Sequence, residues 1–318
     1  MRSESFPTTC AKAAFRMPEV IAGIAALRAR LRRARVPGAS IGLVPTMGAL
    51  HRGHAKLFET ARGENDFLVA SIFVNPIQFD RAEDLEKYPR TMDDDLRVCD
   101  SCGVDLVFAP TAAELYPCEQ MTFVESPVLG AHLCGAHRPG HFRGVATVVL
   151  KLLNIVEPTR AYFGEKDAQQ LAIIRRMVLD LNVPVTVVPV ATVREADGLA
   201  LSSRNKHLTA GQRAIAPVLS RALRRTADSL TRGELRVAAL RSDALGMFGQ
   251  HPEARVEYFE ICDPDTLQPV ERVAGPVLIA GAMWLGSTRL IDNMRLWGGP
   301  PGPRPTPSSA LPRPKLNW

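Results

Sequence analysis

Residues 40–62, SIGLVPTMGALHRGHAKLFETAR, contain the pattern that decides the fold. Residues 40–45 are a short apolar run typical of a buried strand, and residues 51–62 have the composition of a helix, with a glycine-containing turn between them. A buried strand that leads into a helix is the opening unit of a parallel α/β sheet. In such sheets ligands bind beyond the carboxyl ends of the strands, where a helix N-terminus offers free N–H groups.

The rest of the chain continues this alternation. Residues 168–181 have apolar side chains at the three- and four-residue spacing of an amphipathic helix, and residues 144–156 are apolar nearly all round, which predicts a buried helix. Further strands are predicted at 67–74, 105–108, 161–163, 185–193, 255–262, 277–285 and 288–296. We therefore expect an α/β protein, with a Rossmann-like parallel sheet domain followed by a smaller α+β C-terminal domain.

The texture of the sequence changes after residue 205, where long Ala-, Leu- and Arg-rich helical patterns begin. This change predicts a first domain over residues 17–205 and a smaller lid domain over residues 206–297. Residues 1–16 have no clear pattern, and residues 298–318 are dense in Pro, Gly and Ser, so both ends are expected to be flexible.

Composition excludes several classes of protein. The chain has 318 residues, of which 46% are hydrophobic and 23% charged, as in soluble globular proteins. The net charge of +6 raises the question of nucleic-acid binding, but aromatic residues make up only 6%, and no basic run is interleaved with them. No apolar stretch approaches the roughly 20 residues that span a bilayer. We expect no nucleic-acid partner and no membrane segment.

Cysteine usage favours a cytoplasmic protein. The six cysteines are scattered through predicted helices and strands of a chain that is large enough to fold without disulfides. Cys99 and Cys102 have the C-x-x-C spacing of redox or zinc sites, but no second pair completes a zinc site. Packing in a helix is the better explanation for this pair.

His51 and His54 carry the main chemical signal of the opening segment. Three residues apart at a helix start, they share one helical face and can donate hydrogen bonds to a polyphosphate. Taken alone, a His-x-Gly-His pattern is more often a pair of surface histidines. A metal site is weaker still, because the sequence places no third ligand.

Several longer motifs change this balance. The segments PTMGALHRGH (45–54), SIFVNPIQF (71–79), YFGEKDAQQL (162–171), READGLALSSRN (194–205) and TRLIDNMRL (288–296) together resemble the pantothenate synthetase family of the nucleotidyltransferase superfamily. The resemblance implies ATP-dependent ligation of pantoate and β-alanine through a pantoyl-adenylate, with release of AMP and pyrophosphate. The alternatives are another nucleotidyltransferase of the same superfamily and, from the basic pI, an RNA-binding module.

The resemblance also implies site residues. The catalytic residues would be His51, His54, Lys166 and Arg204, with His54 in the usual proton-donor role. The ATP site would comprise Met47, Gly48, Ala49, Leu50, His51, Arg52, Gly53, His54, Gly164, Glu165, Lys166, Asp167, Val193, Leu201, Ser202, Ser203 and Arg204. Leu201 stands where the family commonly has Met, a swap that keeps volume.

Pantoate and β-alanine are expected beside the nucleotide. The resemblance implies that Gln78 and Gln170 bind pantoate, with Pro45, Met47, Val145 and Val148 as an apolar wall. Arg138 and Arg143 are further candidates for phosphate or carboxylate contact. Asp94 is a candidate Mg²⁺ ligand. The alternative is that the acidic residues at this helix start only interact favourably with the helix dipole. The family also implies a homodimer.

Overall fold

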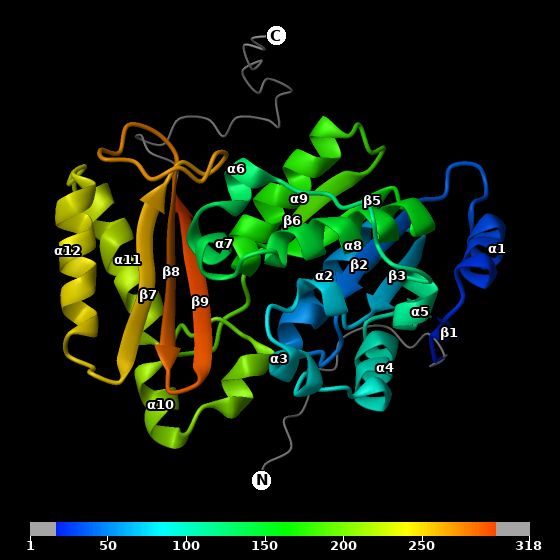
Figure 1. Cartoon of the computed structure of the whole chain (residues 1–318), viewed down its shortest axis with the longest axis horizontal. Helices are drawn as coiled ribbons and strands as arrows, with labels where there is room; N and C mark the ends of the chain where they lie inside the picture. The colour runs from blue at the N-terminus through cyan, green and yellow to red at the C-terminus, as the bar shows by residue number, and fades with distance from the viewer. Residues whose placement is uncertain (1–16, 297–318) are drawn as a thin grey trace.

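A six-stranded parallel sheet forms the first part of the structure, a computed structural model that describes residues 17–296 (Figure 1). The predictions for residues 1–16 and 298–318 lie outside the described residues. The strands follow the order β1-β4-β3-β2-β5-β6, and every neighbouring pair is parallel. Their bounds are β1 Glu19–Ile21, β2 Ile41–Thr46, β3 Phe67–Ile72, β4 Leu106–Phe108, β5 Arg160–Gly164 and β6 Thr186–Val190.

Helices cover both faces of this sheet, as the alternation in β2 requires. Leu43 lies in a core with helices α1 (Ile24–Ala34), α8 (His141–Val156) and α9 (Ala168–Asp180), whereas Val44 lies in a second core with α2 (Arg52–Glu64) and α4 (Met92–Ser101). Successive strand residues point to opposite faces, so a continuous apolar run is needed to fill both cores. The strands predicted as buried apolar runs are therefore confirmed.

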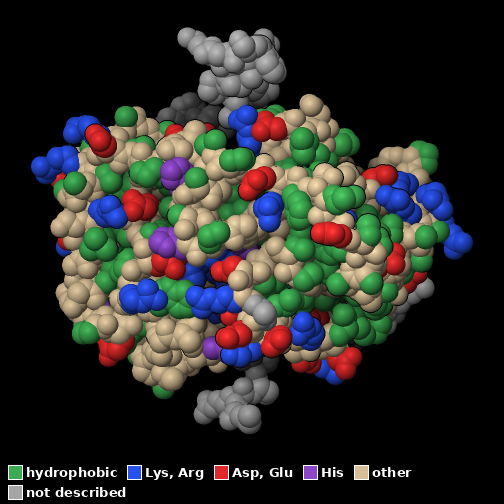
Figure 2. Space-filling model, viewed as in Figure 1, with side chains coloured by type: hydrophobic (Ala, Val, Ile, Leu, Met, Phe, Trp, Pro, Cys, Tyr) green, Lys and Arg blue, Asp and Glu red, His purple; other side chains and the backbone are tan. Residues whose placement is uncertain are grey.

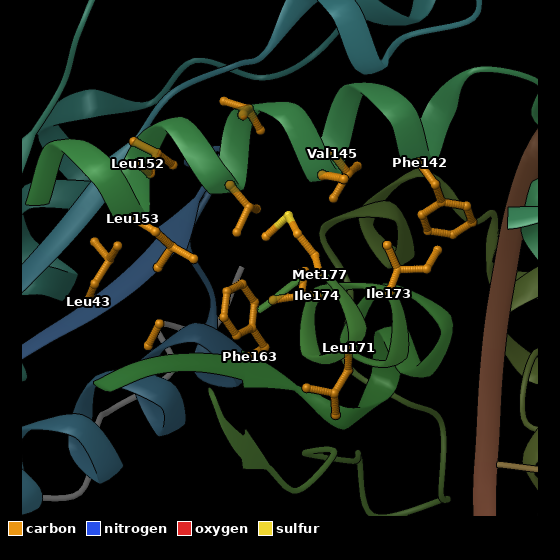
Figure 3. Close-up of a cluster of buried hydrophobic side chains, with 14 of the residues drawn as sticks. Leu43, Phe142, Val145, Leu152, Leu153, Phe163, Leu171, Ile173, Ile174 and Met177 are labelled. Carbon is orange, nitrogen blue, oxygen red and sulfur yellow. The ribbon is translucent and has the colours of Figure 1, made fainter. Parts of the chain in front are cut away.

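Helix α8 is the apolar helix predicted over residues 144–156. Its side chains face those of α9 and of the strand residues Leu43 and Phe163 (Figure 3). Eleven of its sixteen residues are buried, and each large apolar side chain buried in this way contributes about 1.5–3 kcal/mol. The packing fixes α8 against the sheet, and the N-terminus of α8 lies close to the site described below.

Short elements connect the sheet to its surroundings. Four short helices and two 3-10 turns link the strands of the first sheet, and none of them was predicted from the sequence. They are α3 Ala82–Glu86, α5 Ala112–Leu115, α6 Pro127–Gly130, α7 Leu133–His137, η1 Pro76–Gln78 and η2 Glu165–Asp167. The short edge strand β1 was also missed, because three residues are too few for a periodic pattern.

A three-stranded antiparallel sheet forms the second part, with the order β7-β8-β9. Figure 1 shows α11 and α12 on one side of this sheet and the first part of the chain on the other. The elements are η3 Ser203–His207, α10 Ala210–Ile215, α11 Val218–Thr231, α12 Val237–Phe248, β7 Ala254–Cys262, β8 Val277–Leu285 and β9 Thr288–Leu296. The predicted fold class, a parallel α/β unit followed by a smaller α+β unit, is confirmed.

The two sheets are joined by apolar packing. Tyr258, Leu278, Ala280 and Ala282 of the second sheet belong to the same buried cluster as the α8 and α9 side chains. A separate buried cluster around α11 and α12 includes Leu199, which lies before the domain boundary predicted at residue 205. Within residues 17–296, no helix is long and apolar enough to cross a membrane.

Candidate active site

The site lies where the strand order reverses. Strands β2 and β5 are neighbours, but β2 is followed by β3 on one side and β5 by β6 on the other. This switch point leaves a crevice at the carboxyl ends of the two strands, which is where open α/β sheets bind ligands. Strand β2 ends at Thr46 and leads into residues 47–54, the loop and helix start predicted to bind ATP. Strand β5 ends at Gly164, the first residue of the segment GEKD (164–167), which we call the GEKD turn. Topology therefore brings the two segments together.

The loop after β2 is held by a carboxylate. Asp95 of α4 is 2% exposed and accepts hydrogen bonds from the main-chain N of Ala49 at 3.0 Å and of Leu50 at 2.7 Å. Gly48 has φ of +79°, and a Cβ there would lie 2.8 Å from an oxygen of Asp95. Only glycine fits that position without strain. The acidic run in the first turn of α4 thus supplies the side chain that holds the loop, a role the sequence does not assign to Asp95.

The two predicted histidines lie side by side at the start of α2. Their ring centroids are 4.2 Å apart. The Nδ1 atom of His51 accepts from the main-chain N of Gly53, and that of His54 accepts from the main-chain N of His51, at 3.1 and 3.3 Å. An Nδ1 that accepts cannot carry the proton of a neutral ring. Both imidazoles therefore have Nε2–H groups that can donate to a ligand.

Both histidines are neutral near pH 7. Burial, followed by the charge of Lys166, lowers the pKa of His51 to about 4. Burial and the neighbouring His51 and Lys166 lower the pKa of His54 to about 3. A neutral imidazole can donate a hydrogen bond from Nε2 but has no imidazolium proton to transfer. The charge of Lys166 contributes to the lowered pKa of both rings.

Cations from two segments line one cavity. Lys166, Ser202, Arg204 and Asn205 line a narrow cavity of about 10 Å³, together with residues of β9. The Lys166 side chain is 17% exposed, and its ion-pair partner is the adjacent Asp167 at 3.8 Å. On the face in Figure 2, Lys and Arg side chains gather between the two sheets. The structure thus brings the GEKD turn and the 201–204 loop together, as the sequence predicts for an anion site.

The 201–204 loop has a defined base. The main-chain N of Leu201 donates to the carbonyl of Val193 at 2.9 Å, and Ser202 caps η3 by accepting from the N of Arg204. Ser203 is partly buried, and the Arg204 side chain is exposed. Arg204 is therefore free to reach a ligand that enters the crevice.

Gln78 lies at the end of η1, against Met47. Its Nε2 donates to the Met47 sulfur at 3.0 Å, and its Oε1 accepts from Asn75 Nδ2 at 3.0 Å. The Tyr116 hydroxyl donates to the other side of the Asn75 amide, and Asn75 is 1% exposed. Asn75 fixes the Gln78 amide, and it was missed although it stands in the quoted motif VNPIQF.

The main chain of Gln78 is held as firmly. The His141 ring donates from Nδ1 to the carbonyl of Gln78 at 2.8 Å, so its Nε2 accepts from Arg138 at 3.0 Å. Arg138 also pairs with Asp80 at 3.2 Å. A Cβ at Gly144 would lie 2.5 Å from the Ile77 carbonyl, so glycine is required where α8 meets η1. Arg138, predicted as an anion contact, is committed to this support.

The other residues predicted to bind pantoate differ in how far they are buried. Gln170 is partly buried in the first turn of α9, and Gln169 faces elsewhere, donating to the carbonyls of Leu129 and His132. Val145 and Val148 are buried in the core cluster, and Pro45 is partly buried. Met47 also lines a cavity of about 320 Å³ with Phe73, Pro89, Arg90 and other residues.

Two predicted contact residues, Asp94 and Arg143, lie in a different environment from the one expected. Asp94, expected at Mg²⁺, is 72% exposed and pairs with Arg97, so it is Asp95 that points to the loop. Arg143 stacks over the Phe123 ring at 4.6 Å. Among the described residues, no group of three His, Cys, Asp or Glu side chains could hold a metal ion. Cys99 is buried and free, in agreement with a packing role.

Comparison with known proteins identifies the family. The family model described as pantoate-beta-alanine ligase matches residues 19–295. A pantothenate synthetase from Moorella thermoacetica is 52% identical over 278 residues, which cover 87% of this chain and 98% of that protein.

Solved structures agree. The pantothenate synthetase of Thermus thermophilus superposes with a TM-score of 0.81 at 47% identity, over 87% of this chain and 98% of that one. A pantoate-beta-alanine ligase from Francisella tularensis, solved with β-γ ATP and β-alanine, gives 0.68 at 32% identity, over 87% and 97%. The chain belongs to the pantoate–β-alanine ligase family.

Proposed function

We propose that this enzyme joins pantoate to β-alanine in two steps at the switch-point crevice. A pantoate carboxylate oxygen attacks the α-phosphorus of ATP and pyrophosphate leaves. The β-alanine amine then attacks the acyl carbon of the adenylate, and AMP leaves as the amine loses a proton. The observation that carries this proposal is the convergence of two neutral Nε2–H imidazoles with the charge of Lys166 at one crevice.

The imidazoles are proposed to bind the phosphates as hydrogen-bond donors. Rigid donors placed before the reaction stabilise charge that grows on the leaving pyrophosphate without having to reorganise. The main-chain contacts to Nδ1 support this, because they aim the Nε2–H of His51 and of His54 outward from the helix start. No proton needs to pass from either ring.

Lys166 and Arg204 are proposed to neutralise the phosphate charge from the other side of the crevice. Lys166 is mostly buried in a fixed turn, which suits contact with the α-phosphate during attack. Arg204 lies on a loop with two adjacent serine hydroxyls, which suits closure over the triphosphate. The remaining ATP residues predicted from the motifs would line the same space.

Pantoate is proposed to lie against Met47 and Gln78, with Gln170 and Pro45 nearby. A neutral amide can hydrogen-bond the hydroxyl and carboxylate of pantoate without cancelling the charge of the attacking oxygen. The paired supports of Gln78, Asn75 on its amide and His141 on its carbonyl, favour a residue whose orientation matters.

Mg²⁺ is proposed to enter with ATP, held mainly by phosphate oxygens and water. Asp95 is already occupied by two main-chain N–H groups, and Asp94 is exposed and paired, so neither fits a protein-built metal cage. Mg²⁺ commonly keeps several waters and few carboxylates, which agrees with this arrangement.

A cytoplasmic homodimer is proposed for the assembled enzyme. Met121 and Val128 are 89% and 62% exposed on one connecting segment, which suits burial against a second copy. The five cysteines among the described residues are free thiols, which fits a reducing compartment. Light scattering would give the mass in solution, and a monomer at micromolar concentration would reject the dimer.

A substrate-omission assay tests the function directly. With pantoate, β-alanine and Mg·ATP together, we expect AMP, pyrophosphate and an amide product, and pyrophosphate should require pantoate. His54→Ala should reduce pantoate-dependent pyrophosphate release by about 100-fold or more, the loss expected for a donor to the developing charge. A product that retains the nucleotide would instead favour another nucleotidyltransferase, and near-normal turnover of His54→Ala would reject its assigned role.

A further inference from the structure

Strand β9 of the second sheet contacts the GEKD turn of the first domain. The side-chain Nδ2 of Asn293 donates to the carbonyl of Glu165 at 2.9 Å and to that of Lys166 at 2.8 Å. An amide nitrogen has two hydrogens, so this contact uses both. Asn293 therefore fixes the main chain from which the Lys166 side chain extends.

Asp292, the residue before Asn293, supports the hairpin that leads into the 201–204 loop. Asp292 is 4% exposed and accepts from both terminal nitrogens of Arg194, at 2.6 and 2.9 Å. Arg194 also donates to the carbonyl of Gly198 at 3.0 Å. A main-chain hydrogen bond from the N of Glu195 to the carbonyl of Leu199 closes the same hairpin.

This hairpin is the base of the loop that carries Arg204. Leu201 is bonded to Val193, the residue before Arg194, so a shift of Arg194 moves the start of the loop. A bidentate Arg–carboxylate pair fixes orientation as well as distance. Two consecutive residues of β9 thus hold two segments that lie far apart in the sequence.

We propose that Asp292 and Asn293 are positioning residues that set where Lys166 and Arg204 stand relative to each other in the ATP site. The proposal rests on the roles assigned above to Lys166 and Arg204. Neither β9 residue needs to touch the substrate. Their effect is on geometry, and a misplacement of about 1 Å in an active site can cost about 100-fold in rate.

Docking of the second sheet against the first domain does not depend on Asp292 and Asn293. Tyr258, Leu278, Ala280 and Ala282 already bury apolar surface against the first domain. Loss of two hydrogen bonds from Asn293 should therefore leave the domains together while the GEKD turn gains freedom. This separates a positioning role from that of a general structural contact.

A double-mutant cycle provides the test. Pyrophosphate release is measured in single turnovers with saturating enzyme, for the wild type, Asn293→Ala, Lys166→Ala and the double variant. If Asn293 acts through Lys166, Asn293→Ala lowers the rate about 10- to 100-fold in the wild type and less than about 3-fold once Lys166 is absent. Asn293→Asp keeps the side-chain size but places an acceptor oxygen against the carbonyls of Glu165 and Lys166, so it should lower the rate at least as much as Asn293→Ala.

A second cycle pairs Asp292→Asn with Arg204→Ala, and the same pattern of non-additivity is expected. The control is Asp243→Asn, which weakens a similar bidentate pair with Arg225 (2.6 and 2.8 Å) between α11 and α12, and it should leave the rate within about 2-fold. Thermal unfolding of each variant verifies that it is folded.

The outcomes distinguish a failure of the positioning role of Asn293 from a failure of the role assigned to Lys166. Equal fold losses with and without Lys166 would overturn the positioning role of Asn293 and leave the function intact. A Lys166→Ala enzyme that keeps its full rate would instead remove the assigned role of Lys166. Unchanged rates in both β9 variants would also overturn the inference.

Discussion

The carboxylate of Asp95 lies 2.7 Å from the main-chain N of Leu50 and 3.0 Å from that of Ala49, so one buried side chain shapes the loop that precedes both histidines. Asp95→Ala leaves these N–H groups without a partner, at a cost of about 1–3 kcal/mol in unfolding free energy. We expect kcat/KM for ATP to fall about 10-fold or more, because the loop loses its shape. Urea unfolding and initial rates measure the two effects.

The neighbour provides the control. Asp94→Ala removes a carboxylate of the same run, but that side chain is 72% exposed, so its effect on stability should stay within about 0.5 kcal/mol. A loss of activity in Asp94→Ala that increasing Mg²⁺ restores would instead revive Asp94 as a metal ligand.

Asn75 determines the orientation of Gln78. Asn75→Ala removes the donor to the Gln78 amide and leaves that oxygen partly unsatisfied. We expect the KM for pantoate to rise about 10-fold, the factor that corresponds to about 1.4 kcal/mol, with little change in the KM for ATP. Steady-state rates with each substrate varied in turn give both constants.

Asn154→Ala is the control for this substitution, since Asn154 is exposed on α8. Its rates should match those of the wild type. An increase in the KM for ATP equal to that for pantoate in Asn75→Ala would mean that Asn75 supports the whole crevice and not Gln78 in particular.

Long apolar runs and motifs made much of this fold predictable from the sequence. The runs at 40–45 and 67–74 have the length and composition typical of buried strands, and the quoted motifs located the loop, the GEKD turn and the 201–204 segment. The supporting contacts were not predictable. Asp94 and Asp95 are equivalent in sequence, and only the rotation of α4 decides which one meets the loop.

The other supporting residues could not be predicted because they act through long-range contacts. Asn293 meets Lys166 across 127 positions, and Asp292 meets Arg194 across 98. Nothing local in the strand marks either side chain as a partner, because hydrophobic periodicity describes only which face is buried. Short elements such as η1 carry no period at all, although η1 positions Gln78.

The buried ion pair between Arg289 and Glu257 should matter for stability. Both side chains are 10% exposed, and Trp284 Nε1 also donates to Glu257 at 2.8 Å. Glu257→Gln leaves the guanidinium without its charge partner, and breaking a buried pair in this way costs about 3–5 kcal/mol. Urea unfolding measures the loss. Arg176→Ala breaks an exposed pair with Asp180 and should cost at most about 1 kcal/mol, so similar losses would contradict the argument.

The pH dependence of stability should report the neutral histidines. Burial lowers the pKa of His51 to about 4 and that of His54 to about 3, from an ordinary value near 6.5. Between about pH 6.5 and pH 4 the unfolded chain binds protons at these positions and the folded chain does not, so the free energy of unfolding falls as the pH falls. Above about pH 7.5 the two histidines should contribute no slope.

One variant isolates this effect. His54→Gln cannot take up the proton, so its unfolding free energy should fall less steeply between about pH 6.5 and pH 4.5 than that of the wild type. The same pKa values predict that kcat/KM has no inflection near pH 6.5 from His51 or His54. A wild-type slope in His54→Gln, or an inflection near the ordinary histidine pKa that disappears in that variant, would show that His54 titrates normally. It would then be protonated at mildly acidic pH, and its proposed role as a neutral donor would have to be abandoned.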